Sequence, residues 1–158
     1  MELFSWIWDY AIPFLFILTV LVFVHEMGHY FVARWNGVRV EVFSIGFGRE
    51  LFGWNDALET RWKVSLIPLG GYIRMFGDED ASSRASADVA TMLPEEQAVC
   101  FYHKGVGQRS AIAAAGPAAN FLFAIVVLSF MFTTVGQPFS SAQITDVVPE
   151  SAADVAGI

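Results

Sequence analysis

The chain has 158 residues, of which 55% are hydrophobic and 16% are charged. A soluble domain carries roughly 25% charged residues to cover its surface, so this composition excludes an ordinary soluble protein, and it excludes disorder along the whole chain. A formal net charge of −7 disfavours nucleic acid as a partner, because few cations are available to neutralise phosphates. A single cysteine, Cys100, leaves no internal disulfide framework. The class that remains is a membrane protein.

Two apolar runs are each long enough to cross a bilayer as a helix. Residues 13–32 are apolar except around His25, Glu26 and His29, and residues 111–132 contain no charged side chain. A helix of about 20 residues spans about 30 Å, the thickness of the hydrocarbon core. A cleaved secretory signal would need a basic start and a small-residue cleavage site, and the first run shows neither. The sequence therefore predicts two transmembrane helices.

All nine lysine and arginine residues lie between the two apolar runs. They are Arg34, Arg39, Arg49, Arg61, Lys63, Arg74, Arg84, Lys104 and Arg109. Because cytoplasmic loops carry the excess of basic residues, residues 34–109 are predicted on the cytoplasmic side of the membrane. Both ends of the chain are then predicted to face outward, and membrane lipid is an expected partner.

The connecting segment contains two strand patterns followed by a polar stretch. Apolar and polar side chains alternate over residues 38–43, and residues 62–68 and 72–75 form a second run rich in apolar side chains. These strands fit either a membrane-associated, re-entrant β region shielded by protein or a small cytoplasmic hairpin domain. From residue 77 the composition turns acidic and rich in serine and alanine, which predicts a mobile loop.

The first apolar run contains the pattern H-E-x-x-H at His25, Glu26 and His29. At about 100° per residue, the two histidines lie one turn apart on one face of a helix, where they can share a Zn²⁺ ion. Glu26 is then near enough to activate water. Ionisable residues inside a membrane span are costly and are therefore functional by default. This predicts a metal site, in preference to a polar cluster that only packs two helices together.

Asn120 in the second run is expected at a depth similar to that of His25. From the cytoplasmic side, His25 lies roughly 12 Å deep and Asn120 about 14 Å deep. The small residues before Asn120 let another helix approach closely. Two interpretations of its amide stay open, namely binding of an extended peptide or a developing oxyanion and an interhelical hydrogen bond.

A hydrolytic zinc site usually has three protein ligands and a water, and only two ligands are evident. His103 precedes the second run and resembles an interfacial residue. The remaining candidates, Asp78, Glu79 and Asp80, lie in the expected mobile loop.

These motifs resemble the site-2 protease family of intramembrane zinc metalloproteases. Besides H-E-x-x-H, the stretch Pro-Leu-Gly-Gly-Tyr-Ile-Arg-Met at residues 68–75 resembles the membrane re-entrant β-loop of that family. The stretch Ala-Gly-Pro-Ala-Ala-Asn-Phe at residues 115–121 resembles a segment of its next span, and residues 147–157 resemble the opening of a PDZ domain. The four motifs occur in the order found in the family.

The resemblance implies that His25 and His29 bind zinc and that Glu26 activates water. It also implies that Asn120 helps to position substrate, and that the strand at Gly70, Gly71 and Tyr72 pairs with an unwound substrate by β-addition. Members of the family cut transmembrane segments, in one bacterial branch those of a single-span anti-sigma factor. The resemblance to that branch implies a bacterial inner membrane, with both ends of the chain periplasmic. The family's third ligand is an aspartate in a later span, so the chain resembles an N-terminal portion.

The predicted fold class is an α-helical polytopic membrane protein with a small membrane-associated β-hairpin region and the start of a PDZ-like domain. The predicted parts are a first span at 1–36, the β region at 37–76, a cytoplasmic mobile loop at 77–108, a second span at 109–136 and the PDZ start at 137–158. The predicted function is a zinc metalloendopeptidase acting on transmembrane substrates. The alternatives are a catalytically incomplete membrane scaffold that binds peptides and, disfavoured by the apolar runs, a soluble zinc protease.

Overall fold

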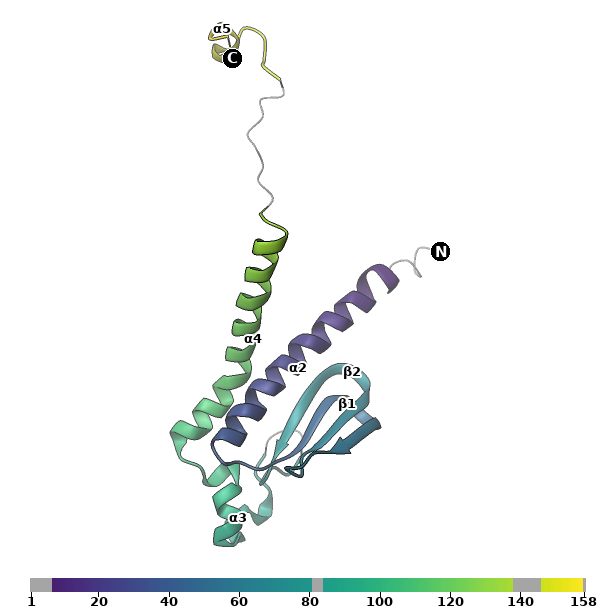
Figure 1. The fold of residues 1–158 in the computed structure, drawn as a ribbon, viewed down its shortest axis with the longest axis vertical. Helices are drawn as coiled ribbons and strands as arrows, with labels where there is room; N and C mark the ends of the chain where they lie inside the picture. The colour runs from purple at the N-terminus through teal and green to yellow at the C-terminus, as the bar shows by residue number, and fades with distance from the viewer. Residues whose placement is uncertain (1–6, 81–83, 138–145, 158) are drawn as a thin grey trace. The chain divides into compact units, whose positions relative to one another are not determined.

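The computed structural model describes residues 7–80, 84–137 and 146–157 (Figure 1). The elements in chain order are a π-helical turn η1 (Ile7–Ala11), α2 (Ile12–Trp35), β1 (Val40–Asn55), β2 (Arg61–Met75), a 3-10 turn η2 (Ala87–Thr91), α3 (Pro94–Val99), a 3-10 turn η3 (Phe101–His103), α4 (Val106–Thr134) and α5 (Ala152–Val155). The chain divides into two compact units, Met1–Val126 and Val127–Ile158.

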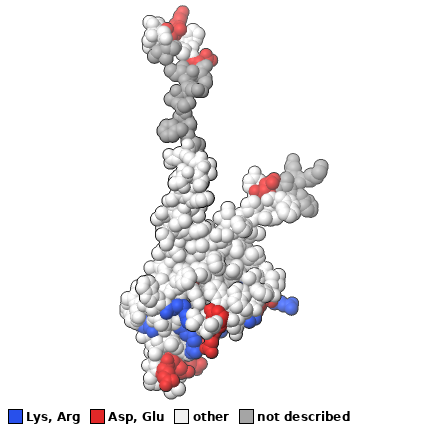
Figure 2. Space-filling model, viewed as in Figure 1, with Lys and Arg blue, Asp and Glu red and all other residues white. Residues whose placement is uncertain are grey.

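Both apolar runs form helices that are long and apolar enough to cross a membrane. These are Ile7–Trp35 and Val106–Thr134, each of 29 residues, and each contains an 18-residue stretch whose mean hydropathy is 2.2 or 2.1, respectively. Most of their large apolar side chains are exposed, as expected when lipid rather than protein is the solvent. On the face shown in Figure 2, charged side chains gather around α3 and the sheet, and the surface of α2 carries almost none. The predicted pair of long apolar helices is confirmed.

The end of α2 is defined by local chemistry at two residues. The Asn36 side chain donates from Nδ2 to the carbonyl of Val32 at 2.8 Å, and Gly37 follows with φ of +68°. A left-handed residue at this point ends the helix without a steric cost only if it is glycine. The chain can therefore turn back at once and enter β1.

The strands β1 and β2 form an antiparallel sheet. Both strands bend, so that part of each one has partners on both of its sides. Val42 has two partners, Arg74 and Arg61, so the first part of β1 lies between the two ends of β2. The second part of β1 pairs only with the start of β2, as in Trp54 opposite Trp62. Residues 71–75 therefore form an outer edge of the sheet. The predicted small β region is confirmed, although β1 continues well beyond the predicted residues 38–43.

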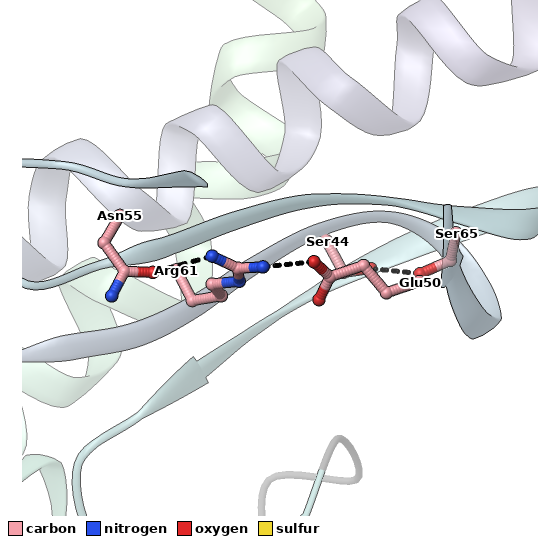
Figure 3. Close-up of polar contacts among 5 residues, drawn as sticks. All are labelled: Ser44, Glu50, Asn55, Arg61 and Ser65. Atoms are coloured by element: carbon pink, nitrogen blue, oxygen red, sulfur yellow. Dashed lines mark hydrogen bonds and ion pairs between the residues drawn. The ribbon is translucent and has the colours of Figure 1, made fainter. Parts of the chain in front are cut away.

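Polar contacts hold the register of the sheet (Figure 3). Arg61 donates to Asn55 at 3.1 Å and forms an ion pair with Glu50 on the same neighbouring strand. The hydroxyls of Ser44 and Ser65 lie 3.2 Å apart and are buried. Each contact links β1 to β2, so these contacts favour a single register of the two bent strands.

The hydrophobic core lies where the C-terminal end of α2 meets the sheet and the first turns of α4. Phe43 is 1% exposed, and its ring stacks on Trp62 with centroids 4.4 Å apart. The remaining buried members are Tyr30, Ala33, Val38, Val40, Ile73, Met75 and Ile112. Because three elements contribute to one cluster, the sheet is attached to the helix that carries His25 and His29.

Asp56 adds a polar attachment between the sheet and α2. Its carboxylate accepts hydrogen bonds from Trp62 Nε1 at 2.8 Å and from the hydroxyl of Tyr30 at 3.3 Å. The backbone amides of Leu58 and Thr60 also donate to it. Desolvation by itself would raise the pKa of Asp56, but the donors outweigh it and hold that pKa below its ordinary value.

The segment 77–108, predicted from composition as a mobile loop, contains regular structure. The elements η2, α3 and η3 lie in it, and the mobility predicted for the segment stays a prediction. Asp78 is 8% exposed, and it accepts hydrogen bonds from the amide of Met75 and the hydroxyl of Tyr102. Burial raises the pKa of Asp78. The acidic composition of the segment does not by itself show that Asp78 is buried and hydrogen-bonded to nearby residues.

In the unit Val127–Ile158, the described residues comprise the last turns of α4 and the short helix α5. Ser151 caps α5, because its hydroxyl accepts a hydrogen bond from the amide of Asp154 at 3.2 Å. Part of the predicted start of a PDZ domain at 137–158, namely residues 138–145 and 158, lies outside the described residues, and the short helix α5 does not by itself define such a domain. The PDZ start therefore stays a prediction.

Helices α2 and α4 approach closely at Gly28. A methyl group added there would lie 2.7 Å from the Cβ of Ala119 and would overlap the carbonyl oxygen of Ala115. Small residues at such contacts are typical of membrane helices, where close van der Waals packing replaces the hydrophobic driving force.

We expect Gly28→Ala to destabilise the protein by about 1–3 kcal/mol, the cost of overpacking a tight contact. Gly107→Ala is the matched control, because Gly107 lies in the first turn of α4 with nothing within 4 Å of its added methyl. Thermal unfolding of the purified protein in detergent measures both. Equal midpoints for the two variants would contradict the close contact.

Candidate metal centre

His25 and His29 lie one turn apart on α2 with their rings directed at one point. The two Nε2 atoms are 3.2 Å apart, and the ring centroids are separated by 4.8 Å. Two nitrogens bound to one tetrahedral zinc at 2.0–2.1 Å would be about 3.3 Å apart. The observed spacing therefore fits a shared zinc ion.

The main chain of α4 orients His29. Its Nδ1 lies 2.7 Å from the carbonyl oxygen of Ile112, and because a carbonyl only accepts, Nδ1 carries the proton. In the neutral ring Nε2 is then unprotonated and available as a ligand. A ligating histidine usually donates its other N–H to a carbonyl or carboxylate in this way.

Gly116 provides the space into which both imidazoles point. A Cβ at this position would lie 2.7 Å from Nε2 of His25 and closer still to Nε2 of His29. Gly116 is itself buried, so the two ring nitrogens meet at the surface of α4 where it has no side chain. The hollow is a second feature of the structure that fits a bound metal ion.

Glu26 and His29 line one cavity of about 360 Å³. His29 and Ile112 line one part of the cavity, and Tyr72 and Ile73 of β2 line another. The carboxylate of Glu26 faces the backbone amide of Ile73. A carboxylate is thus placed between His29 and the outer strand of the sheet, with room for a small group beside it.

The predicted substrate-binding strand reaches the site at Gly71 and Tyr72. A Cβ on Gly71 would lie 2.9 Å from Cγ1 of Val22 and 3.6 Å from Cγ of Glu26, so glycine allows β2 to pass directly over α2. The ring of Tyr72 stacks on Phe47 with centroids 5.9 Å apart. Gly70 does not line the cavity; it has φ of +125° and packs against Phe47.

Asn120 also lies at the imidazole pair. Its Nδ2 is 3.3 Å from Nδ1 of His25, so the structure brings together two residues separated by 95 positions in the chain. This arrangement matches the interhelical interpretation left open by the sequence. The amide contacts His25, a proposed metal ligand. The predicted role of Asn120 in positioning a substrate stays a prediction.

The described residues hold no group of three or more His, Cys, Asp or Glu side chains positioned for a metal ion. His103 is exposed in η3, and Asp78 is engaged with Met75 and Tyr102. The two histidines are thus the ligands that this part of the chain offers.

Two features of the site were not identified from the sequence. The carbonyl of Ile112 has no side-chain signature, and the role of Gly116 as the hollow for both rings appears only in three dimensions. One signal was available, since Ile112, Gly116 and Asn120 recur at every fourth position and so share one face of α4.

The comparisons with known proteins agree with this geometry. The model of peptidase family M50 matches residues 13–155. A protein of Rhizobium meliloti, provisionally named a zinc metalloprotease, is 50% identical over 152 residues, 95% of this chain and 41% of that protein. Metalloprotease MmpA of Caulobacter vibrioides is 43% identical over 155 residues, 92% of this chain and 39% of its own length.

A third relative is regulator of sigma-E protease RseP of Escherichia coli, which is 45% identical over 154 residues, 98% of this chain and 32% of RseP. The chain belongs to peptidase family M50, the site-2 protease family, which confirms the resemblance drawn from its motifs. Zinc is the cofactor that this family implies. The chain spans about two fifths of the length of the first relatives it matches.

We expect Gly116→Ala to lower zinc affinity at least tenfold, because the added methyl would occupy the space where the two Nε2 atoms converge. The zinc content of the purified protein, measured by atomic spectrometry after dialysis against a graded chelator, checks this. Gly107→Ala in the same helix should retain its zinc. Unchanged zinc in Gly116→Ala would contradict the placement of the metal at this hollow.

Proposed function

We propose that the chain carries the zinc-binding and water-activating part of an intramembrane metalloendopeptidase. The observation that carries the proposal is the pair of Nε2 atoms 3.2 Å apart on a helix apolar enough to span a membrane. Membership of peptidase family M50 supports the same conclusion. His25 and His29 are the proposed zinc ligands, and a third ligand is proposed from elsewhere in the complete protein, since hydrolytic zinc sites usually use three.

Glu26 is the proposed general base. When bound, zinc would polarise the scissile carbonyl and make a water molecule acidic enough to react near neutral pH. Glu26 would take the proton from that water and later pass it to the leaving amine. Its position in a cavity that His29 also lines supports this role, because the carboxylate lies next to one of the proposed ligands.

The proposed substrate is the transmembrane segment of a single-span protein. A helix hides its carbonyls in internal hydrogen bonds, so a segment must unwind before water can attack. The outer edge of β2 at Gly71 and Tyr72, which lines the same cavity as Glu26, supports β-addition of the unwound segment. The name of the Escherichia coli relative, a regulator of sigma-E protease, supports an anti-sigma-factor-like substrate.

The alternative is a membrane scaffold that binds peptides without cutting them. It would bind them through its outward-facing domain and would not depend on the carboxylate of Glu26. Cleavage that requires Glu26 therefore separates the two functions.

In the full-length protein, we expect Glu26→Gln to reduce cleavage of a transmembrane substrate about 10²–10⁴-fold, the usual contribution of a general base, while zinc content stays unchanged. His25→Ala should lose zinc as well as activity. The exposed Glu95 of α3 supplies the control Glu95→Gln, which should cleave normally. Sustained turnover by Glu26→Gln would overturn the assigned role.

We also propose that residues 34–109 face the cytoplasm of a bacterial inner membrane, supported by the confinement of all basic residues to that segment. A cysteine introduced at the exposed Glu95 should react with a membrane-impermeant maleimide only after cell lysis. One introduced at Val135, which is 82% exposed beyond the end of α4, should react in intact spheroplasts. The reverse labelling pattern would contradict the orientation.

A further inference from the structure

Asn120 makes an incomplete set of contacts at the imidazole pair. Its Nδ2 faces Nδ1 of His25 at 3.3 Å. Its Oδ1 is buried and has no hydrogen-bond partner among the described residues. A buried amide oxygen without a partner carries a desolvation cost of about 1–3 kcal/mol, so this orientation of the amide calls for an explanation.

The contacts in the structure form one directed chain of hydrogen bonds. Nδ2 of Asn120 donates to Nδ1 of His25, whose Nε2 can then donate to Nε2 of His29 at 3.2 Å. The proton on Nδ1 of His29 goes to the carbonyl of Ile112. In this arrangement the proton of neutral His25 is on Nε2, the atom that would have to ligate the metal.

Metal binding requires the other neutral tautomer of His25, with the proton on Nδ1 and a free lone pair on Nε2. Half a turn of the Asn120 amide exchanges Nδ2 for Oδ1, which then accepts the proton of His25 Nδ1. The amide oxygen gains a partner, and neither ring changes charge. Asparagine suits both arrangements because one planar group carries a donor and an acceptor.

We propose that Asn120 is a positioning residue for His25, whose amide oxygen holds the imidazole in its metal-binding tautomer, as the carbonyl of Ile112 does for His29. In this assignment α4 sets both ligands from one face, with the side chain of Asn120 two turns after Ile112 and Gly116 between them. Asn120 acts on the metal through His25, and this role needs no contact with the substrate. The inference rests on the proposed function, because it assumes that His25 is a zinc ligand.

The test measures zinc affinity by chelator competition on the full-length protein in detergent, for two substitutions at position 120. Asn120→Leu keeps the approximate volume and removes the acceptor, and it should weaken zinc binding about 10–100-fold, as loss of an outer-shell partner does. Asn120→Asp keeps an acceptor oxygen and should bind zinc at least as tightly as the native protein. Asn55→Leu, at an exposed amide of the sheet, should leave the affinity unchanged.

Two results would overturn the inference. One is native zinc affinity in Asn120→Leu together with lost cleavage, which would assign Asn120 to the substrate. The other is equal weakening by Asn120→Leu and Asn120→Asp, which would show that the acceptor is not what matters. His25→Ala is measured alongside, so that failure of this inference can be told from failure of the proposed function. Zinc retained in His25→Ala would contradict the assignment of His25 as a metal ligand, on which the proposed function depends.

Discussion

The candidate site depends on the close contact between α2 and α4. Gly28 on α2 and Gly116 on α4 have no side chain, and a methyl group at either would overlap atoms of the opposite helix. Inside a bilayer apolar side chains gain little by leaving lipid, so packing at this distance has to come from shape and van der Waals contact. With larger residues at these positions, neither Ile112 nor Asn120 would reach the imidazoles.

The contact also makes polar groups tolerable in an apolar span. Two imidazoles and a carboxylate in hydrocarbon are costly unless their polar atoms have partners. One nitrogen of each ring faces a polar group of α4, and the other faces the neighbouring ring. The same contacts that reduce the cost of burial also orient the ring nitrogens, so stability and the proposed chemistry have a common origin.

The sheet contributes the third side of the site. The first part of β1 pairs with both ends of β2, so its backbone groups find their hydrogen-bond partners within the protein. The core around Phe43 and Trp62, with Asp56 bonded to Tyr30, attaches the sheet to α2. The free edge at Gly71 and Tyr72 is thereby held beside Glu26, where an extended peptide could pair with it in the proposed function.

The sequence by itself determined the two apolar helices, the strand patterns and the spacing of His25, Glu26 and His29, because each depends on local periodicity. It also indicated that His25 and Asn120 lie at similar depth, since helical rise converts residue number into distance. It did not indicate that Asp78, in the acidic segment after Gly77, bonds to Met75 and Tyr102, because composition does not reveal partners.

Only the tertiary structure decided which atoms meet. Every residue has a backbone carbonyl, so the sequence does not show that the carbonyl of Ile112 contacts His29. The amide of Asn120 could have faced a peptide or another helix. The hollow at Gly116 became meaningful only once α2 was packed against it. Periodicity places a residue on a face of its own helix, but the partner of that face is set by packing between segments far apart in the chain.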